Sequence, residues 1–129
     1  APPNFLLNAL SAIIFFGLQS QITKICRNLY PVRPDLVENG LSRNILRDSE
    51  DPGALGIFAS GAKLPFSSSA NELLEHFGGP VLVAQGILDP LNDAKKRSEM
   101  FKMAYSNVEA VDIMGGHCPM DEMPEEVSE

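Results

Sequence analysis

Cysteine and histidine are scarce in this sequence of 129 residues, which holds two of each and no tryptophan. Cys26 lies in a helical pattern and Cys118 stands beside His117, so the two cysteines do not make a disulfide framework. Together with His76 and His117 they also lack the spacing of metal ligands. We therefore expect neither a metal nor another cofactor, and a reducing compartment suits the two thiols.

Basic residues are outnumbered, because 10 lysines and arginines stand against 17 acidic residues, for a net charge of −7. Nucleic acids and anionic headgroups attract basic faces, so this balance argues against a nucleic-acid partner and against docking on a membrane by charge. The acidic residues crowd the end of the chain. After Pro119 they suit the amino end of a helix, whose dipole favours negative charge, and most of them are expected to be solvated. They are Asp121, Glu122, Glu125, Glu126 and Glu129.

A long uninterrupted hydrophobic run is also lacking. The most apolar stretch, residues 5–18 (FLLNALSAIIFFGL), carries no charge but is shorter than the roughly 20 residues that cross a bilayer. Its apolar side chains point in almost all directions, which predicts a helix buried on several sides. Phe15 and Phe16 could line an apolar substrate pocket or rest on a membrane surface. Packing in a core or on a partner is the alternative.

The sequence does contain a histidine on a glycine turn. Residues 108–113 form a strand-like run, and Gly115 and Gly116 then break the strand and place His117 on a loop. Histidine can exchange a proton at working pH, so at the end of a strand it is a candidate general base. A solvated loop histidine, just ahead of the helix that Pro119 opens, is the alternative.

An aspartate follows a second strand-like run. Residues 80–85 (PVLVAQ) are typical of a buried parallel strand, and Asp89 comes just past its carboxyl end, where open α/β sheets place their sites. A helix predicted over residues 93–105 then leads to the strand before His117. Asp89 and His117 can therefore meet, and the acid would fix the imidazole tautomer. Asp93 is the competing acid, but its position at the start of that helix predicts a cap.

The order strand, G-x-x-D-P, helix, strand, G-H-C-P-x-D-E-x-P-E-E-V resembles the C-terminal third of an α/β-hydrolase. The likeness covers residues 73–129. The form GHCPxDExPE is most similar to the plant-plastid and cyanobacterial branch that includes pheophytinase and chlorophyll dephytylase. By this resemblance Asp89 matches the triad acid and His117 the triad base. It also implies a chloroplast location and an ester substrate with an apolar alcohol or acid, for which a phytyl ester of a chlorophyll derivative is the leading example.

The resemblance implies an α/β fold in two parts, an incomplete α/β-hydrolase fold. Residues 1–68 are typical of short helices with little strand signal and would form the helical cap region. Residues 69–129 would form the C-terminal part of the core, with the last two parallel strands and their flanking helices. The length and the hydrophobic content of 44% suit a globular domain.

The nucleophile motif of that family does not occur in this sequence. The nearest segment to G-x-S-x-G is residues 56–61 (GIFASG), which has Phe58 where the first glycine should stand and lies on the wrong side of the cap region. Cys118 is a poor substitute, because neighbouring residues on one loop rarely aim at each other. We therefore expect no hydrolysis by this chain alone. We expect a larger gene product or a second chain to supply a serine or aspartate nucleophile.

Two functions remain open. In the first, the completed protein is a carboxylic ester hydrolase in which His117 is the general base and Asp89 orients it. In the second, a truncated hydrolase is a noncatalytic subunit of a larger, membrane-associated complex, and the pair is vestigial. Both need a partner, because two parallel strands leave an open edge and an uncovered face. Tyr30, at the end of the first helical stretch, is expected to pack rather than to touch substrate.

Overall fold

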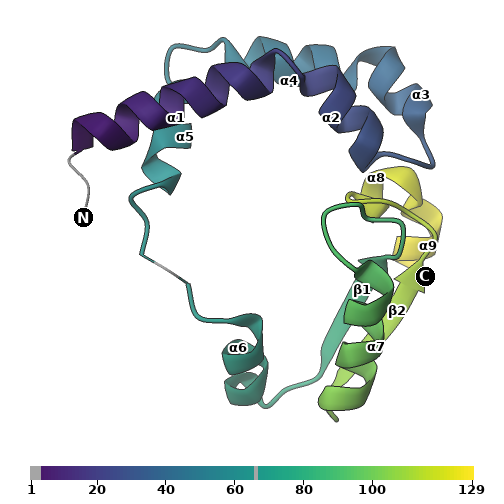
Figure 1. Ribbon diagram of the computed structural model, residues 1–129. Helices are drawn as coiled ribbons and strands as arrows, with labels where there is room; N and C mark the ends of the chain where they lie inside the picture. The colour runs from purple at the N-terminus through teal and green to yellow at the C-terminus, as the bar shows by residue number, and fades with distance from the viewer. Residues whose placement is uncertain (1–3, 66) are drawn as a thin grey trace. The chain divides into compact units, whose positions relative to one another are not determined.

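The computed structural model describes residues 4–65 and 67–129, which form a mixed α/β chain as the sequence predicts (Figure 1). The chain divides into two compact units. Of the described residues, one unit contains those up to Cys26 together with residues 36–65, and the other contains Arg27–Asp35 together with Ser67–Glu129. The division into a hydrolase cap and a hydrolase core stays a prediction.

The first helical stretch ends at a sharp bend. Helix α1 (Asn4–Gln19) is followed by α2 (Ile22–Leu29), and the two are bent by 71°. The hydroxyl of Ser20 donates to the carbonyl of Gly17 at 2.8 Å, which interrupts the helical ladder at this point. No single helix of the described residues is long and apolar enough to cross a membrane, whereas α1 and α2 taken together across the bend reach that length and composition.

Short helices follow, as the sequence predicts. The rings of Phe15 and Phe58 lie 5.4 Å apart where α1 packs on the last of these helices, α5, at residues 54–61. Gln19 donates to the side chain of Ser49 at 2.8 Å. Gly40 interrupts the regular helix with a φ of 134°, which side-chain-bearing residues rarely adopt. The elements are α3 (Pro34–Leu36), the π-helical turn η1 (Val37–Leu41), α4 (Ser42–Ser49) and α5 (Ala54–Gly61).

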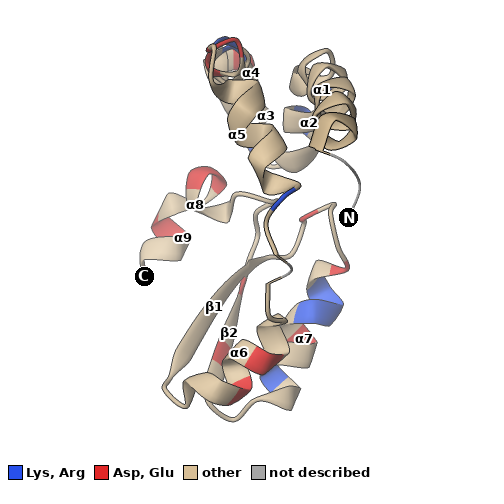
Figure 2. Ribbon diagram, turned by 90° about the vertical axis from the view of Figure 1, so that its left-hand side faces the viewer, with Lys and Arg blue, Asp and Glu red and all other residues tan. Residues whose placement is uncertain are grey.

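Helix α1 keeps much of its apolar surface in contact with solvent. It carries no charged side chain, which Figure 2 shows as an unbroken tan ribbon. Phe5, Ile13 and Phe16 are 68%, 72% and 58% exposed. Because α1 is apolar on almost all sides, the contact with α5 covers only part of it. The predicted burial on several sides is therefore not reached within this unit.

The second unit holds the sheet. Strands β1 (Val81–Gly86) and β2 (Val108–Ile113) pair in parallel, with Val81 opposite Val108 and Gly86 opposite Ile113. Helix α6 (Ala70–Phe77) precedes β1, and α7 (Ala94–Ala104) connects the strands, since parallel strands need a crossover. Ser69 caps α6, and Asp93 caps α7 as predicted, by accepting from the N–H of Lys96 at 3.3 Å.

Helix α7 covers one face of the sheet. The hydroxyl of Ser98 donates to the carboxylate of Asp112, and Nζ of Lys102 donates to the same carboxylate at 3.0 Å. The opposite face carries Leu82 and Val111, which are 67% and 40% exposed. No further strand of the described residues pairs with β1. The open edge and the uncovered face expected from the sequence are both present in this unit.

The chain ends in two short helices where the sequence predicted one. They are α8 (Pro119–Glu122) and α9 (Pro124–Ser128). Pro124 disfavours the helical region for the residue before it, and Met123 has φ −134° and ψ 57°. The second proline therefore stops α8 after one turn and begins α9.

Candidate acid–histidine site

The loops that carry Asp89 and His117 lie side by side because the backbone pairing continues past the strands. The N–H of Ile87 donates to the carbonyl of Ile113 at 3.0 Å, and the N–H of Leu88 donates to the carbonyl of Gly115 at 3.0 Å. The register of a parallel pair thus brings both loops to the carboxyl edge of the sheet.

Asp89 and His117 meet at this edge. Oδ2 of Asp89 lies 3.2 Å from Nδ1 of His117. The Asp89 side chain is 8% exposed and the imidazole 42%, so the acid is enclosed while the histidine can be reached from solvent. A proton on Nδ1 can bind the carboxylate, which leaves the lone pair of Nε2 to accept a proton. The pair has the geometry that orients a general base.

Further donors fix the Asp89 carboxylate. Its Oδ1 accepts from the N–H of Leu91 at 2.9 Å, and its Oδ2 accepts from Nδ2 of Asn92 at 2.8 Å. Burial acts to raise the pKa of Asp89, but the hydrogen bonds from Leu91, His117 and Asn92 and the charge of His117 outweigh it and hold the pKa below its ordinary value. Asp89 is therefore held as a carboxylate, the form that orients a histidine.

Asn92 is a further residue of this site, which the sequence reasoning above did not identify. The pattern Asp-Pro-x-Asn is a signal that could have found it. The N–H of Leu91, two residues after Asp89, binds that carboxylate, as in other turns that aspartate side chains form. The same turn brings the amide of Asn92 to Asp89.

Two glycines allow the loops to approach so closely. A Cβ on Gly86 would collide with the carbonyl oxygens of Gly115 and Gly116. A Cβ on Gly116 would collide with the carbonyl oxygen of Leu29 and the ring of Pro31. These positions need glycine for lack of space, which adds a second reason for the Gly-Gly turn predicted to end the strand.

A buried glutamate joins the histidine loop to the segment before α3. Glu122 is 2% exposed. Its Oε1 accepts from the N–H groups of Val32 and Arg33 at 2.8 and 3.0 Å, and its Oε2 accepts from the N–H of Gly116. Most of the C-terminal acidic residues are exposed, as expected, but Glu122 is the exception. The sequence around it gave no signal, because only the fold places those three N–H groups near its carboxylate.

The same segment is held by two further contacts. The N–H of His117 donates to the carbonyl of Leu29 at 3.0 Å, and the hydroxyl of Tyr30 donates to Oδ2 of Asp121 at 2.7 Å. Tyr30 is 6% exposed. Its burial, with hydrogen bonds to Cys118 and Asp121, raises the pKa of the phenol. Tyr30 is a packed and hydrogen-bonded residue, as predicted.

The other candidates take structural positions. Asp93 serves as the cap of α7. Ser60, in the segment nearest to a nucleophile motif, lies on α5 and donates to the carbonyl of Ile57 at 2.6 Å, within its own helix. A nucleophile elbow instead stands on a sharp turn between a strand and a helix. In the part of the chain that the structure describes, no group of three or more histidine, cysteine or acidic residues could hold a metal ion.

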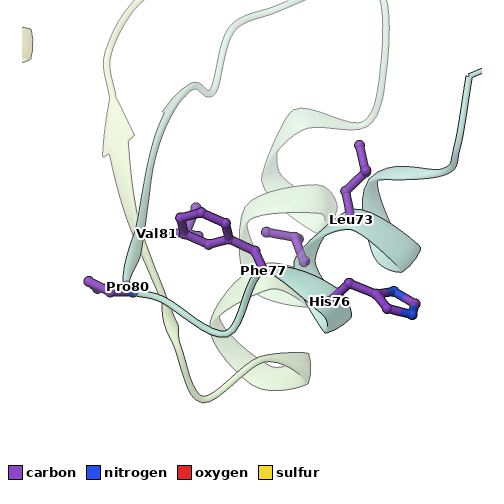
Figure 3. Close-up of a pocket in the computed structure, with 6 residues that line it drawn as sticks. Leu73, His76, Phe77, Pro80 and Val81 are labelled. Atoms are coloured by element: carbon purple, nitrogen blue, oxygen red, sulfur yellow. The ribbon is translucent and has the colours of Figure 1, made fainter.

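An apolar hollow of about 630 Å³ lies at the amino end of β1, remote along the strand from Asp89. In Figure 3 the ring of Phe77 lies near Val81, while His76 points away from both. Neither member of the Asp89–His117 pair lines it, so it is separate from the candidate site. Its lining consists of Leu73, Leu74, His76, Phe77, Pro80 and Val81.

Comparisons with protein families, with curated proteins and with solved structures found no match. The geometry of the pair suits proton transfer by the histidine. A histidine oriented by an enclosed carboxylate can take a proton from a nucleophile and return it to a leaving group.

Proposed function

We propose that Asp89 and His117 are the acid and the general base of an ester hydrolase of the α/β-hydrolase type. The observation that carries the proposal is the 3.2 Å contact between Oδ2 of Asp89 and Nδ1 of His117. The two loops follow the carboxyl ends of neighbouring parallel strands. Their order along the chain, acid before histidine, is also that of the family.

In this mechanism Nε2 of His117 accepts the proton of a serine hydroxyl as its oxygen attacks the ester carbonyl. The bond from the carbonyl carbon to the alcohol oxygen then breaks, and His117 returns the proton to that oxygen. Water hydrolyses the acyl-enzyme by the same proton route, and Asp89 stabilises the imidazolium in both steps. With an aspartate nucleophile, the pair would activate the water of the second step. Either nucleophile comes from residues outside this sequence.

The substrate class that we propose is an ester with a long apolar alcohol, with a phytyl ester of a chlorophyll derivative as the first to test. Support comes from the resemblance of residues 115–126 (GGHCPMDEMPEE) to the plastid and cyanobacterial branch. The same resemblance supports a chloroplast location.

The test is phytol release by the native protein, isolated with whatever chains accompany it. We expect His117→Ala to lower kcat by at least about 10³-fold. His76→Ala is the matched control, because His76 is exposed on α6. Asp89→Asn should also lower kcat strongly, whereas Asp93→Asn should not, since asparagine caps a helix as well as aspartate does. Full activity in His117→Ala would refute the proposal.

A fluorophosphonate probe identifies the nucleophile. Covalent labelling of a serine, found by peptide mass mapping of the native particle, supports the serine mechanism. Intact mass measurement of the labelled species shows whether that serine belongs to the same polypeptide as His117 or to a second chain. Ester hydrolysis without labelling favours the aspartate nucleophile.

The exposed apolar surface supports a second candidate, a noncatalytic subunit of a larger, membrane-associated complex. The uncharged helix α1 and the uncovered sheet face with Leu82 both need a partner to exclude water. In that case the native particle contains further chains, releases no alcohol from any ester, and assembles equally well with His117→Ala. Ester hydrolysis that depends on His117 excludes this candidate.

A further inference from the structure

The backbone on both sides of Gly116 is fixed by hydrogen bonds. Its own N–H donates to Oε2 of Glu122, and the N–H of the next residue, His117, donates to the carbonyl of Leu29. Glycine is the residue with the widest choice of φ and ψ. Without these contacts, Gly116 would allow the histidine loop to turn.

The other carboxylate oxygen of Glu122, Oε1, binds the segment before α3. Oε1 accepts from the N–H groups of Val32 and Arg33, in the same segment that receives the N–H of His117. We call the Glu122 carboxylate with the N–H groups of Val32, Arg33 and Gly116 the Glu122 clamp. Its partners are loop N–H groups that no secondary-structure ladder serves, and Glu122 itself is buried.

We infer that Glu122 is a positioning residue, whose clamp sets the direction in which Gly116 presents His117 to Asp89. The inference rests on the proposed function only in taking His117 as the general base. A merely structural role would lower stability and leave the contact between His117 and Asp89 intact in the folded molecules. A positioning role breaks that contact while the sheet stays folded.

Glu122→Gln tests the clamp with almost no change in volume. Glutamine has one acceptor oxygen and one NH2 group. In either orientation of the side-chain amide, its NH2 group faces an N–H donor of the backbone. That donor is the N–H of Gly116 in one orientation and the N–H groups of Val32 and Arg33 in the other. Glu126→Gln is the matched control, because Glu126 is exposed on α9 and outside the clamp.

The readout is NMR of the full chain. Relative to Glu126→Gln, we expect Glu122→Gln to speed amide exchange at Val32, Arg33 and Gly116 by at least about tenfold, as loss of a hydrogen bond to a charged group implies. We also expect the resonance of the proton shared by Nδ1 of His117 and Asp89 to disappear, while the amides of β1 and β2 keep their shifts. Retention of the Nδ1 resonance in folded Glu122→Gln overturns the inference, whether or not the three amides lose their protection.

The unaltered chain gives a second test in case Glu122→Gln does not fold. The amides of Val32, Arg33 and Gly116 lie in loops, yet the clamp predicts that they exchange much more slowly than in an unstructured peptide. Exchange at the unstructured rate overturns the clamp without any variant.

Kinetics on the native particle separate the clamp from the proposed function. A positioning role predicts that Glu122→Gln lowers kcat at least about tenfold with KM unchanged. If His117→Ala is fully active while the Nδ1 resonance depends on Glu122, the clamp stands and the proposed function fails. If His117→Ala is inactive while Glu122→Gln keeps its kcat and its resonance, the clamp fails and the proposed function stands.

Discussion

Gly86, the last residue of β1, lies so close to the carbonyl oxygen of Gly116 that no Cβ fits between them. The contact joins the loops that carry Asp89 and His117. Two residues with no side chain of their own thus determine how near the acid and the histidine can come.

Gly86→Ala should therefore destabilise the sheet unit. The added methyl group meets backbone rather than a flexible side chain, and overpacking of this kind costs roughly 1–3 kcal/mol. Urea denaturation monitored by circular dichroism measures the loss. Gly56→Ala is the control: Gly56 lies in α5, where an added Cβ would meet no atom within 4 Å, and alanine there should raise stability by about 0.5–1 kcal/mol. Equal stability of Gly86→Ala and the unaltered chain would contradict the close approach.

The left-handed end of α6 provides a second backbone prediction. Gly78 has φ 65° at the C-cap of this helix. Gly78→Ala should cost about 1 kcal/mol, because a Cβ disfavours this region. Gly78→Asn should cost less, since asparagine tolerates it best among residues with side chains. Thermal unfolding of the three proteins should rank them glycine, asparagine, alanine, and any other order would argue against this cap.

Asp89 predicts loss of stability in acid. Its pKa in the folded chain lies below the ordinary value of 3.8, so the unfolded chain binds the proton more tightly. The stability that Asp89 contributes is therefore complete above that ordinary value and disappears as the pH falls through the lower folded-state pKa. Urea midpoints measured from about pH 7 to about pH 3 should fall less steeply in Asp89→Asn. An unchanged slope would show that the Asp89 contacts are absent in solution.

Asp93→Asn is the control for that titration, because it exchanges the helix cap for another good cap. The fall of its urea midpoint at low pH should follow that of the unaltered chain. A shallower fall in this variant would assign the effect to the cap of α7 rather than to the site.

The hydrogen bond from the buried phenol of Tyr30 to Asp121 should stabilise the contact between the segment before α3 and the C-terminal helices. Tyr30→Phe keeps the ring and removes the donor to Asp121, at a cost of about 0.5–1.5 kcal/mol. Tyr105→Phe is the control, since the ring of Tyr105 packs near Phe101 with centroids 6.4 Å apart and should keep that contact. Differential scanning calorimetry of the two variants measures the difference, and equal values would contradict the bond.

The sequence determined the local elements well, because their signals are local. Two strand-like runs predicted both strands, and the apolar character of residues 80–85 predicted the parallel pairing. Asp93 was recognised as a cap from its own side chain. The end of the chain was less predictable, because Pro124 splits the expected helix into α8 and α9.

The candidate pair was also predictable from sequence, since the parallel register alone brings Asp89 and His117 to the same edge of the sheet. What only the tertiary structure decided is what surrounds the pair. Glu122 looked like one more solvated acid, and nothing local distinguishes it from Glu126 in an acidic run. Its burial depends on N–H groups of Val32 and Arg33, which lie 90 and 89 positions earlier in the chain. Contacts across such separations are made by the fold, so composition and spacing could not reveal them.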